Sequence, residues 1–334
     1  MSAAGPPQGA NCPAARSAEG SPVAEGPLIY STDHFVLPLP PAHRFPMRKY
    51  ALLRQRVAAI AAPLMRKPAS VTDVDLARVH DPAYIDAVVT GTLDSRALQR
   101  IGFPWTPAMV ERSRRSSGAT LAACRSALAS GCGINLAGGT HHAHRDFGAG
   151  YCVFNDSVVA LRALQAESAI ARALIVDLDV HQGDGTAALL AGDPSVFTLS
   201  LHGRGNFPFR KQSSRLDVEL ADGTGDATYL ATLAIALPRA LDAARPDLAI
   251  YLAGADPFEG DRFGRLALSK RGLGERDRYV LETLHHCAVP VAITMAGGYA
   301  HDDEDVVDIH FATVALALAL FAPAEHVRAH ALAC

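Results

Sequence analysis

The sequence predicts a single α/β domain with an open, mostly parallel β-sheet and helices on both faces. Short apolar, β-rich runs recur along the chain, and Ala- and Leu-rich stretches of helical character separate them. Such alternation is typical of a parallel sheet that is covered on both faces. Neither an internal repeat nor a second type of composition interrupts the pattern, so we expect one domain over residues 27–334.

The overall composition narrows the class of protein. Of the 334 residues, 49% are hydrophobic and 19% are charged, and the formal net charge is -3. Because affinity for nucleic acid depends on clustered Lys and Arg, this balance argues against a nucleic-acid partner. We interpret the densest basic cluster, "ERSRRSS" at 111–117, as the solvated start of a helix.

The two ends of the chain differ in character. Residues 1–26 are rich in Ala, Gly, Pro and Ser and lack the cationic start and apolar core of a secretory signal, so we expect a disordered tail. The apolar run "FATVALALALFA" at 311–322 is shorter than the roughly 20 residues that span a bilayer. It is predicted to be a buried helix, and no membrane partner is expected.

Six cysteines are scattered along the chain without a C-x-x-C pair. In a chain of this length the pattern indicates reduced, mostly buried thiols, and therefore a cytoplasmic protein. It also offers no cysteine-based zinc site.

Six apolar runs are the predicted strands, in chain order. They are "PLIY" at 27–30, which is the weakest candidate, then "GINLA" at 133–137, "ALIVDL" at 173–178, "SVFTLSL" at 195–201, "DLAIYLA" at 247–253 and "VPVAITM" at 289–295. Polar residues follow each of the last five: "GGTHHAH", "DVHQGDG", "HGRGNFPF", "GADPFEGD" and "AGGY", in the same order. Ligands of open α/β sheets bind at the carboxyl ends of the strands, so these five segments together indicate an active site.

A metal site is predicted at two of these strand ends. Asp179 and His181 are two residues apart, so on an extended segment both side chains face the same side. Asp256, at another strand end, is the best-placed third ligand. Two carboxylates and one imidazole leave an open position on a tetrahedral Zn²⁺, as in catalytic sites. Fe²⁺, Mn²⁺ and Co²⁺ would also accept these ligands.

Adjacent histidines are the predicted proton-transfer groups. His141 and His142 follow two glycines, which suit a loop that lines a narrow cavity. Imidazole titrates in the range needed to take a proton from water and pass it to a leaving amine. Asp177 and Asp184 are the carboxylates available to fix the two tautomers. We expect the nearby His144 to lie on the surface.

Tyr299 is the predicted oxyanion donor. It stands behind two glycines at the end of the last apolar run, at the same edge as the expected metal. A phenol in this place can donate a hydrogen bond to the oxyanion that forms when water attacks a carbonyl.

Taken together, these residues resemble the zinc-dependent histone deacetylase family, which has the arginase/deacetylase fold. The matching segments, in the family's order, are "GGTHHA", "GAGYCVFND", "DLDVHQGDGT", "SLH", "AGADPFEGDRFG" and "AGGY". The resemblance extends over roughly residues 30 to 320, and so many motifs together are highly specific. "HQGDG", "EGDRFG" and "HRFPMRKY" look closest to the class IV branch and its bacterial relatives.

The resemblance implies a role for each matching position. It implies that Asp179, His181 and Asp256 are zinc ligands and that Tyr299 stabilises the transition state. His142, supported by Asp184, matches the general base and acid, and His141, paired with Asp177, matches an electrostatic partner. The family's inner potassium site would be formed by Asp177, Asp179, His181, Ser200 and Leu201.

The resemblance also implies the substrate contacts. Gly150 matches the position whose carbonyl holds the acyl-lysine N–H, and Tyr151 and Phe207 look like walls of the substrate channel. Tyr151 replaces a common Phe, and Phe263 lies at the pocket edge where many relatives have Met or Leu, so acyl-chain preference stays open. The acidic rim residue of some relatives has no clear match here.

The implied activity is zinc-dependent hydrolysis of acetyl or longer acyl groups from the side-chain amine of lysine in proteins or peptides. Two alternatives stay open: an amidohydrolase of acylpolyamines or another small N-acyl amine, and a catalytically inactive acyl-lysine binder. A binuclear ureohydrolase of the same fold would need further carboxylates. "PFEGD" after Asp256 contains no second D-x-D pair that would supply them.

Overall fold

The computed structural model describes residues 26–41 and 43–323. Its centre is one sheet of eight strands in the order β2-β1-β3-β8-β7-β4-β5-β6, and every pairing is parallel. The strands are β1 (Leu28–Tyr30), β2 (Met65–Arg66), β3 (Cys132–Asn135), β4 (Ala173–Asp177), β5 (Val196–Gly203), β6 (Leu216–Leu220), β7 (Leu248–Leu252) and β8 (Val291–Thr294). The predicted single α/β domain with an open sheet is therefore confirmed.

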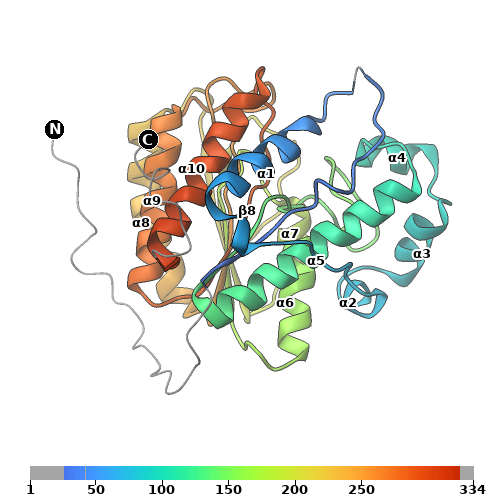
Figure 1. Cartoon of the computed structure of the whole chain (residues 1–334), viewed down its shortest axis with the longest axis horizontal. Helices are drawn as coiled ribbons and strands as arrows, with labels where there is room; N and C mark the ends of the chain where they lie inside the picture. The colour runs from blue at the N-terminus through green and yellow to red at the C-terminus, as the bar shows by residue number, and fades with distance from the viewer. Residues whose placement is uncertain (1–25, 42, 324–334) are drawn as a thin grey trace.

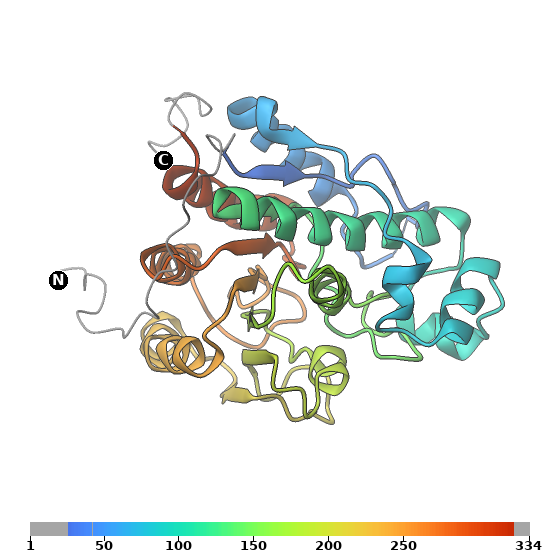
Figure 2. The same ribbon diagram turned by 90° about the horizontal axis from the view of Figure 1, so that it is seen from below.

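Helices cover both faces of the sheet (Figures 1 and 2). One layer holds α1 (Arg48–Ala61), α8 (Asp226–Ala244), α9 (Lys270–His286) and α10 (Asp303–Phe321). The opposite side holds α2 (Asp73–Ala77), α3 (Pro82–Thr90), α4 (Ser95–Ile101), α5 (Pro107–Ser130), α6 (Asp156–Ala166) and α7 (Asp184–Leu189), and a short 3₁₀ helix, η1 (Ala62–Leu64), follows α1. The long helix α5 crosses the sheet close to β3 and β8.

Alternating strand residues build two cores, one under each helix layer. In β4, Leu174 and Val176 belong to the core beneath α8, α9 and α10, whereas Ala173 and Ile175 belong to the core beneath α5 and α6. Because successive side chains of a strand point to opposite faces, a strand buried on both sides must be apolar throughout. This explains why the central strands are continuous apolar runs in the sequence.

Two strands lie outside the predicted runs. β2 has only two residues, which is too short to give a pattern. β6 is an edge strand with the sequence "LDVEL", and its first four residues are partly or fully exposed. An edge strand open to water on one side carries no continuous apolar run, so β6 could not be predicted from the apolar pattern.

The interpretation of the basic cluster at 111–117 as a solvated helix start is wrong. The cluster lies inside α5, four residues after its start. The side chain of Arg112 is buried, donates to the carbonyls of Thr32 and Phe35, and lies over the Tyr50 ring with its guanidinium carbon 4.4 Å from the centroid.

Other expectations concern the chain ends, the C-terminal helix and the cysteines. The tail expected over 1–26 lies, except for Gly26, outside the described residues. α10 is the predicted buried helix, and none of the described helices is long and apolar enough to cross a membrane. The thiols of Cys124, Cys132 and Cys152 are free and buried, as expected for these three.

Candidate active site

The three predicted metal ligands lie together at the carboxyl edge of the sheet. Asp179 and His181 follow β4, Asp256 follows β7, and these two strands are neighbours in register. One ligand atom from each residue can be chosen so that all three lie within 4.8 Å of one another. Asp256 is fully buried, and among the described residues its Oδ2 has no hydrogen-bond partner, although it lies 3.3 Å from Nδ1 of His181.

This cluster fits a divalent cation. A buried carboxylate oxygen without a donor costs free energy unless a positive charge compensates it. Burial and the charge of Asp179 raise the pKa of Asp256 to about 7, which reflects two carboxylates forced together. Backbone N–H groups of Gly297 and Val180 donate to Oδ2 of Asp179 and Oδ1 of Asp256, both at 2.8 Å, and so orient the carboxylates. Oδ1 of Asp179 accepts from the backbone N–H of His181 at 2.9 Å, whereas Oδ2 of Asp256 keeps no donor among the described residues.

Gly297 shows how closely the backbone approaches this cluster. A Cβ atom at this position would lie 1.9 Å from Oδ2 of Asp256 and 2.6 Å from Oδ2 of Asp179. Any side chain would therefore displace both carboxylates. The glycine of "AGGY" is needed here for space.

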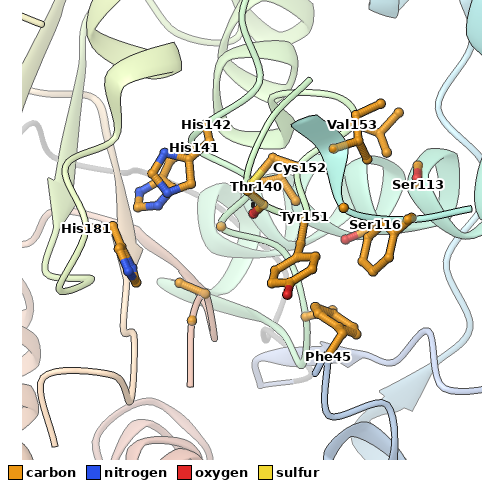
Figure 3. Close-up of a pocket in the computed structure, with 18 of the residues that line it drawn as sticks. Phe45, Ser113, Ser116, Thr140, His141, His142, Tyr151, Cys152, Val153 and His181 are labelled. Atoms are coloured by element: carbon orange, nitrogen blue, oxygen red, sulfur yellow. Dashed lines mark hydrogen bonds between the residues drawn. The ribbon is translucent and has the colours of Figure 1, made fainter. Parts of the chain in front are cut away.

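The paired histidines face the metal cluster, each held by its own carboxylate. Nδ1 of His141 lies 2.7 Å from Oδ2 of Asp177, and Nδ1 of His142 lies 2.6 Å from Oδ1 of Asp184. A ring nitrogen that faces a carboxylate must carry the proton, so Nε2 of His142 is left as the acceptor. The two rings are 4.2 Å apart between centroids (Figure 3).

The two imidazoles differ in protonation. Burial by itself lowers the pKa of His141, but the charges of Asp177 and Asp179 outweigh it and raise the pKa to about 9. Burial, followed by the charge of His141, lowers the pKa of His142 to about 4. In the metal-free chain these shifts favour the protonated form of His141 and the neutral form of His142 at neutral pH. Neighbouring groups whose pKa values are driven apart in this way mark acid and base roles.

His144 does not lie on the surface, contrary to expectation. Its Nε2 is 3.1 Å from Oδ2 of Asp184, and its side chain is only 13% exposed. The contact joins residues 40 positions apart, and a histidine directly after the motif "GGTHHA" carries no sequence signal of such a partner.

The loop that carries the histidines is fixed by the start of α6. Oδ2 of Asp156 accepts from the backbone of Gly139, and its Oδ1 accepts from the backbone of Thr140. The side chain of Asn155 donates to the carbonyl of Ala143 at 3.2 Å. These two residues belong to "VFND", which matched the family pattern, and the structure supplies the physical reason for their presence.

Tyr299 lines the same cavity, in the segment that follows β8. Its backbone N–H donates to Oδ2 of Asp261 at 2.6 Å, and its carbonyl accepts from Arg262 at 2.8 Å. Lys49 is buried beside it, donates to the carbonyl of Gly298 at 2.9 Å, and places its ammonium 5.1 Å from the Tyr299 ring centroid. Burial raises the pKa of the Tyr299 phenol well above its usual value of 10.0, so the hydroxyl stays protonated as a donor.

The four predicted substrate contacts line one cavity of about 490 Å³ together with the metal cluster. Gly150 lies against His142, because a Cβ atom on it would be 2.7 Å from the imidazole Cδ2. Phe207 packs edge-on to the same ring at 4.8 Å, and Phe263 and Tyr151 lie 5.1 and 5.9 Å from the ring of Tyr299. The structure brings together all twelve predicted site residues.

Some cavity residues were not predicted. Phe45 and Phe103 pack edge-on at 4.9 Å, and both lie beside Tyr151. In Figure 3, Phe45 lies on the side of the cavity away from His181. Arg112, Ser113 and Ser116 of α5 also line it. They come from segments before the strand-end motifs, and only "HRFPMRKY", which contains Phe45, had a family signal.

The segments expected to form a potassium site are adjacent. Asp177 and Ser200 are register partners on β4 and β5, and Oγ of Ser200 lies 2.9 Å from Nδ1 of His202. Potassium binding there stays a prediction.

A comparison with protein-family models identifies the family. Residues 43–314 match the model of the histone deacetylase domain. The chain is 43% identical over 287 residues to an uncharacterized protein of Picosynechococcus sp., covering 85% of this chain and 95% of that protein. It is 27% identical over 300 residues to histone deacetylase 2 of Arabidopsis thaliana, covering 86% and 78%. The crystal structure of the HDA15 HD domain has a similar fold, with a TM-score of 0.72, 21% identity, and coverage of 87% of this chain and 90% of that one.

Proposed function

The chain belongs to the histone deacetylase family, and on this premise we propose that it removes acetyl or longer acyl groups from lysine side chains of proteins or peptides. One observation carries the proposal. In a single cavity, an Asp/His/Asp cluster lies beside a neutral imidazole, a cationic imidazole and a protonated phenol. These are the groups that amide hydrolysis requires.

Asp179, His181 and Asp256 would hold the metal, which we propose to be a single zinc. When bound, a zinc ion would supply Lewis-acid polarisation of the amide carbonyl and acidification of water. The chain's remaining groups complete the reaction. Nε2 of His142 takes the proton of the attacking water and later gives a proton to the departing amine. The hydroxyl of Tyr299 donates to the oxyanion, and protonated His141 adds positive charge beside it.

The charges in the cavity favour a peptide lysine over an acylpolyamine. Arg44 and Arg100 line the cavity and are exposed, and Arg112 lines it from α5. The carboxylates among its lining residues are those of Asp179 and Asp256, which the metal would neutralise. A polyamine keeps further ammonium groups after acylation, and like charges at a binding site oppose association. A neutral acyl-lysine stem meets no such repulsion.

Peptides bearing acetyl, lactyl, medium-chain and long-chain acyl-lysine, together with acylated polyamines, should be assayed with and without a chelator. We expect chelator-sensitive release of the acid from at least one lysine peptide, with readdition of zinc restoring it. Turnover of the polyamines alone would assign the alternative substrate. Binding of peptides without any release of acid would indicate an inactive binder. Two tightly bound Mn²⁺ ions per chain would indicate ureohydrolase chemistry. The class IV assignment and the cytoplasmic location stay predictions.

A further inference from the structure

We propose that His144 is a positioning residue of the proton-transfer machinery, which it serves by holding the carboxylate of Asp184 toward His142. The proposal rests on the proposed function. His144 has a polar contact with neither the metal cluster nor the channel in the described part of the chain, so its effect must pass through Asp184.

The two histidine–carboxylate pairs are secured differently. Oδ2 of Asp177 binds His141, and its Oδ1 accepts from the backbone N–H of Asp179 at 3.2 Å. Asp184 has no corresponding backbone donor among the described residues. Its Oδ1 binds His142, and its Oδ2 is bound by Nε2 of His144. The imidazole of His144 therefore binds Asp184 in the way that the backbone N–H of Asp179 binds Asp177.

This arrangement matters because Asp184 depends on its hydrogen bonds. Burial raises the pKa of this carboxyl, but hydrogen bonds from His142 and His144 outweigh burial and lower it below its usual 3.8. A carboxylate held at one oxygen can rotate about its side-chain torsions, whereas one held at both oxygens keeps a single orientation. A base must lie within hydrogen-bond reach of the proton that it abstracts, so the orientation of His142 bears directly on the rate.

His144 is itself rigidly placed. Its ring stacks on Phe147 with centroids 4.2 Å apart and planes at 17°, and its backbone N–H donates to the carbonyl of Phe147 at 2.8 Å. Its own carbonyl accepts from Nδ1 of the buried His80 at 2.8 Å. These contacts fix the position of the His144 imidazole and of its Nε2. A residue that orients a catalytic group must itself be held in this way.

Two substitutions separate hydrogen bonding from packing. His144→Phe keeps a ring on Phe147 and removes the donor, whereas His144→Gln keeps an N–H donor. Arg145→Gln is the matched control, because Arg145 is an exposed neighbour whose side chain makes no described hydrogen bond or ion pair. Each zinc-loaded protein is assayed for kcat and KM on the best acyl-lysine peptide. The ring N–H protons of the metal-free proteins are recorded by NMR, and thermal unfolding is measured for each.

We expect His144→Phe to lower kcat about tenfold with KM within about twofold, as for other groups that orient a reacting residue. His144→Gln should recover most of the loss, and Arg145→Gln should match the parent. The downfield Nδ1–H signal of His142 should weaken or move in His144→Phe only. An unchanged kcat together with an unchanged His142 signal in folded His144→Phe would overturn the proposal, as would an equal loss in both His144 variants.

The NMR measurement also separates the two proposals. If the parent protein hydrolyses no acyl-lysine peptide, the proposed function fails. A changed His142 signal would still establish that His144 acts through Asp184.

Discussion

Single residues in this site differ in chemistry because their surroundings differ. His141 and His142 are adjacent and identical, yet one is driven toward the cation by two carboxylates and the other toward the neutral base by burial. The sequence could predict that both are functional, since they stand together after two glycines at a strand end. It could not predict the contact of His144, because that depends on the distance between a loop and the start of α7, 40 residues further along the chain.

At this scale the proposed role of Tyr299 gives a direct test. Tyr299→Phe should lower kcat by about a hundredfold or more, because the oxyanion loses a donor, while the ring contacts with Phe263 and Tyr151 persist. Steady-state kinetics of the zinc-loaded protein measures the change, and circular dichroism checks the fold. Turnover close to that of the parent would remove Tyr299 from the mechanism.

Among the elements, α9 connects the sheet to the metal cluster through Arg276. This side chain is fully buried, and its Nη1 donates to the carbonyl of Gly254 at 2.7 Å and to that of Leu178 at 3.3 Å. These carbonyls belong to the segments that carry Asp256 and Asp179. Its Nε donates to Asp277, which balances the charge. The apolar runs predicted both strands, but nothing in "GERDRY" indicates that its first arginine reaches beneath the metal ligands.

Replacing Arg276 with Lys should weaken zinc binding by about ten- to a hundredfold. Lysine keeps a positive charge near Asp277, but it lacks the planar guanidinium group whose donors reach the segments after both strands. Competition with a chromogenic chelator measures the affinity without any assay of activity. Arg278→Lys on the same helix is the control, because that side chain is 61% exposed and, in the described part of the chain, forms its ion pair with Glu282. Equal affinities in the two variants would contradict this role of Arg276.

Two helix glycines give opposite predictions for stability. A Cβ atom on Gly118 of α5 would lie 2.0 Å from the carbonyl oxygen of Ala69, so Gly118→Ala should destabilise by about 1–3 kcal/mol. A Cβ atom on Gly274 of α9 meets nothing within 4 Å, so Gly274→Ala should stabilise by about 0.5–1 kcal/mol. Denaturant unfolding of both variants measures the difference. A stabilised Gly118→Ala would show that α5 does not pack this closely.

At the scale of the whole molecule, the sheet and its two helix layers can be predicted from local sequence patterns. The position of the active site depends on the order of the strands in the sheet. Runs such as 173–178 and 247–253 are apolar because both faces are covered, so the sequence predicts these strands and their polar ends. Their adjacency as β4 and β7 is a long-range property of the sheet order. The family resemblance supplied the same ligand set by matching positions. Short or exposed strands such as β6 had no comparable signal.

Acid should destabilise the whole domain through buried neutral histidines, and His80 is the clearest case. Its Nδ1 faces a carbonyl and its Nε2 accepts the backbone N–H of Asn155 at 3.0 Å, so a second proton would break that bond. Burial lowers the pKa of His80 from 6.5 to about 4. The unfolded chain therefore takes up the proton first, and stability present above about pH 6.5 is lost as the pH falls toward 4.

The full effect of His80 is about 3 kcal/mol. Unfolding free energies at pH 7 and pH 5 should show a decrease for the parent protein and a smaller decrease for His80→Gln. The same slope in both proteins would mean that His80 does not contribute. Other groups, including the metal ligands, titrate in both proteins and cancel in the comparison.

Because the metal ligands follow two different strands, β4 and β7, the metal site can form only at a late stage of protein synthesis. A growing polypeptide on the ribosome releases Asp179 and His181 long before Asp256, and Tyr299 comes later still. Since the last ligand is separated from the others by the helices α7 and α8 and the strands β5, β6 and β7, the nascent protein has only a two-ligand fragment until most of its length has been synthesised. The protein can therefore bind the metal ion tightly only when its chain is nearly complete. The ion can then stabilise the assembled sheet, but it does not guide the early steps of folding.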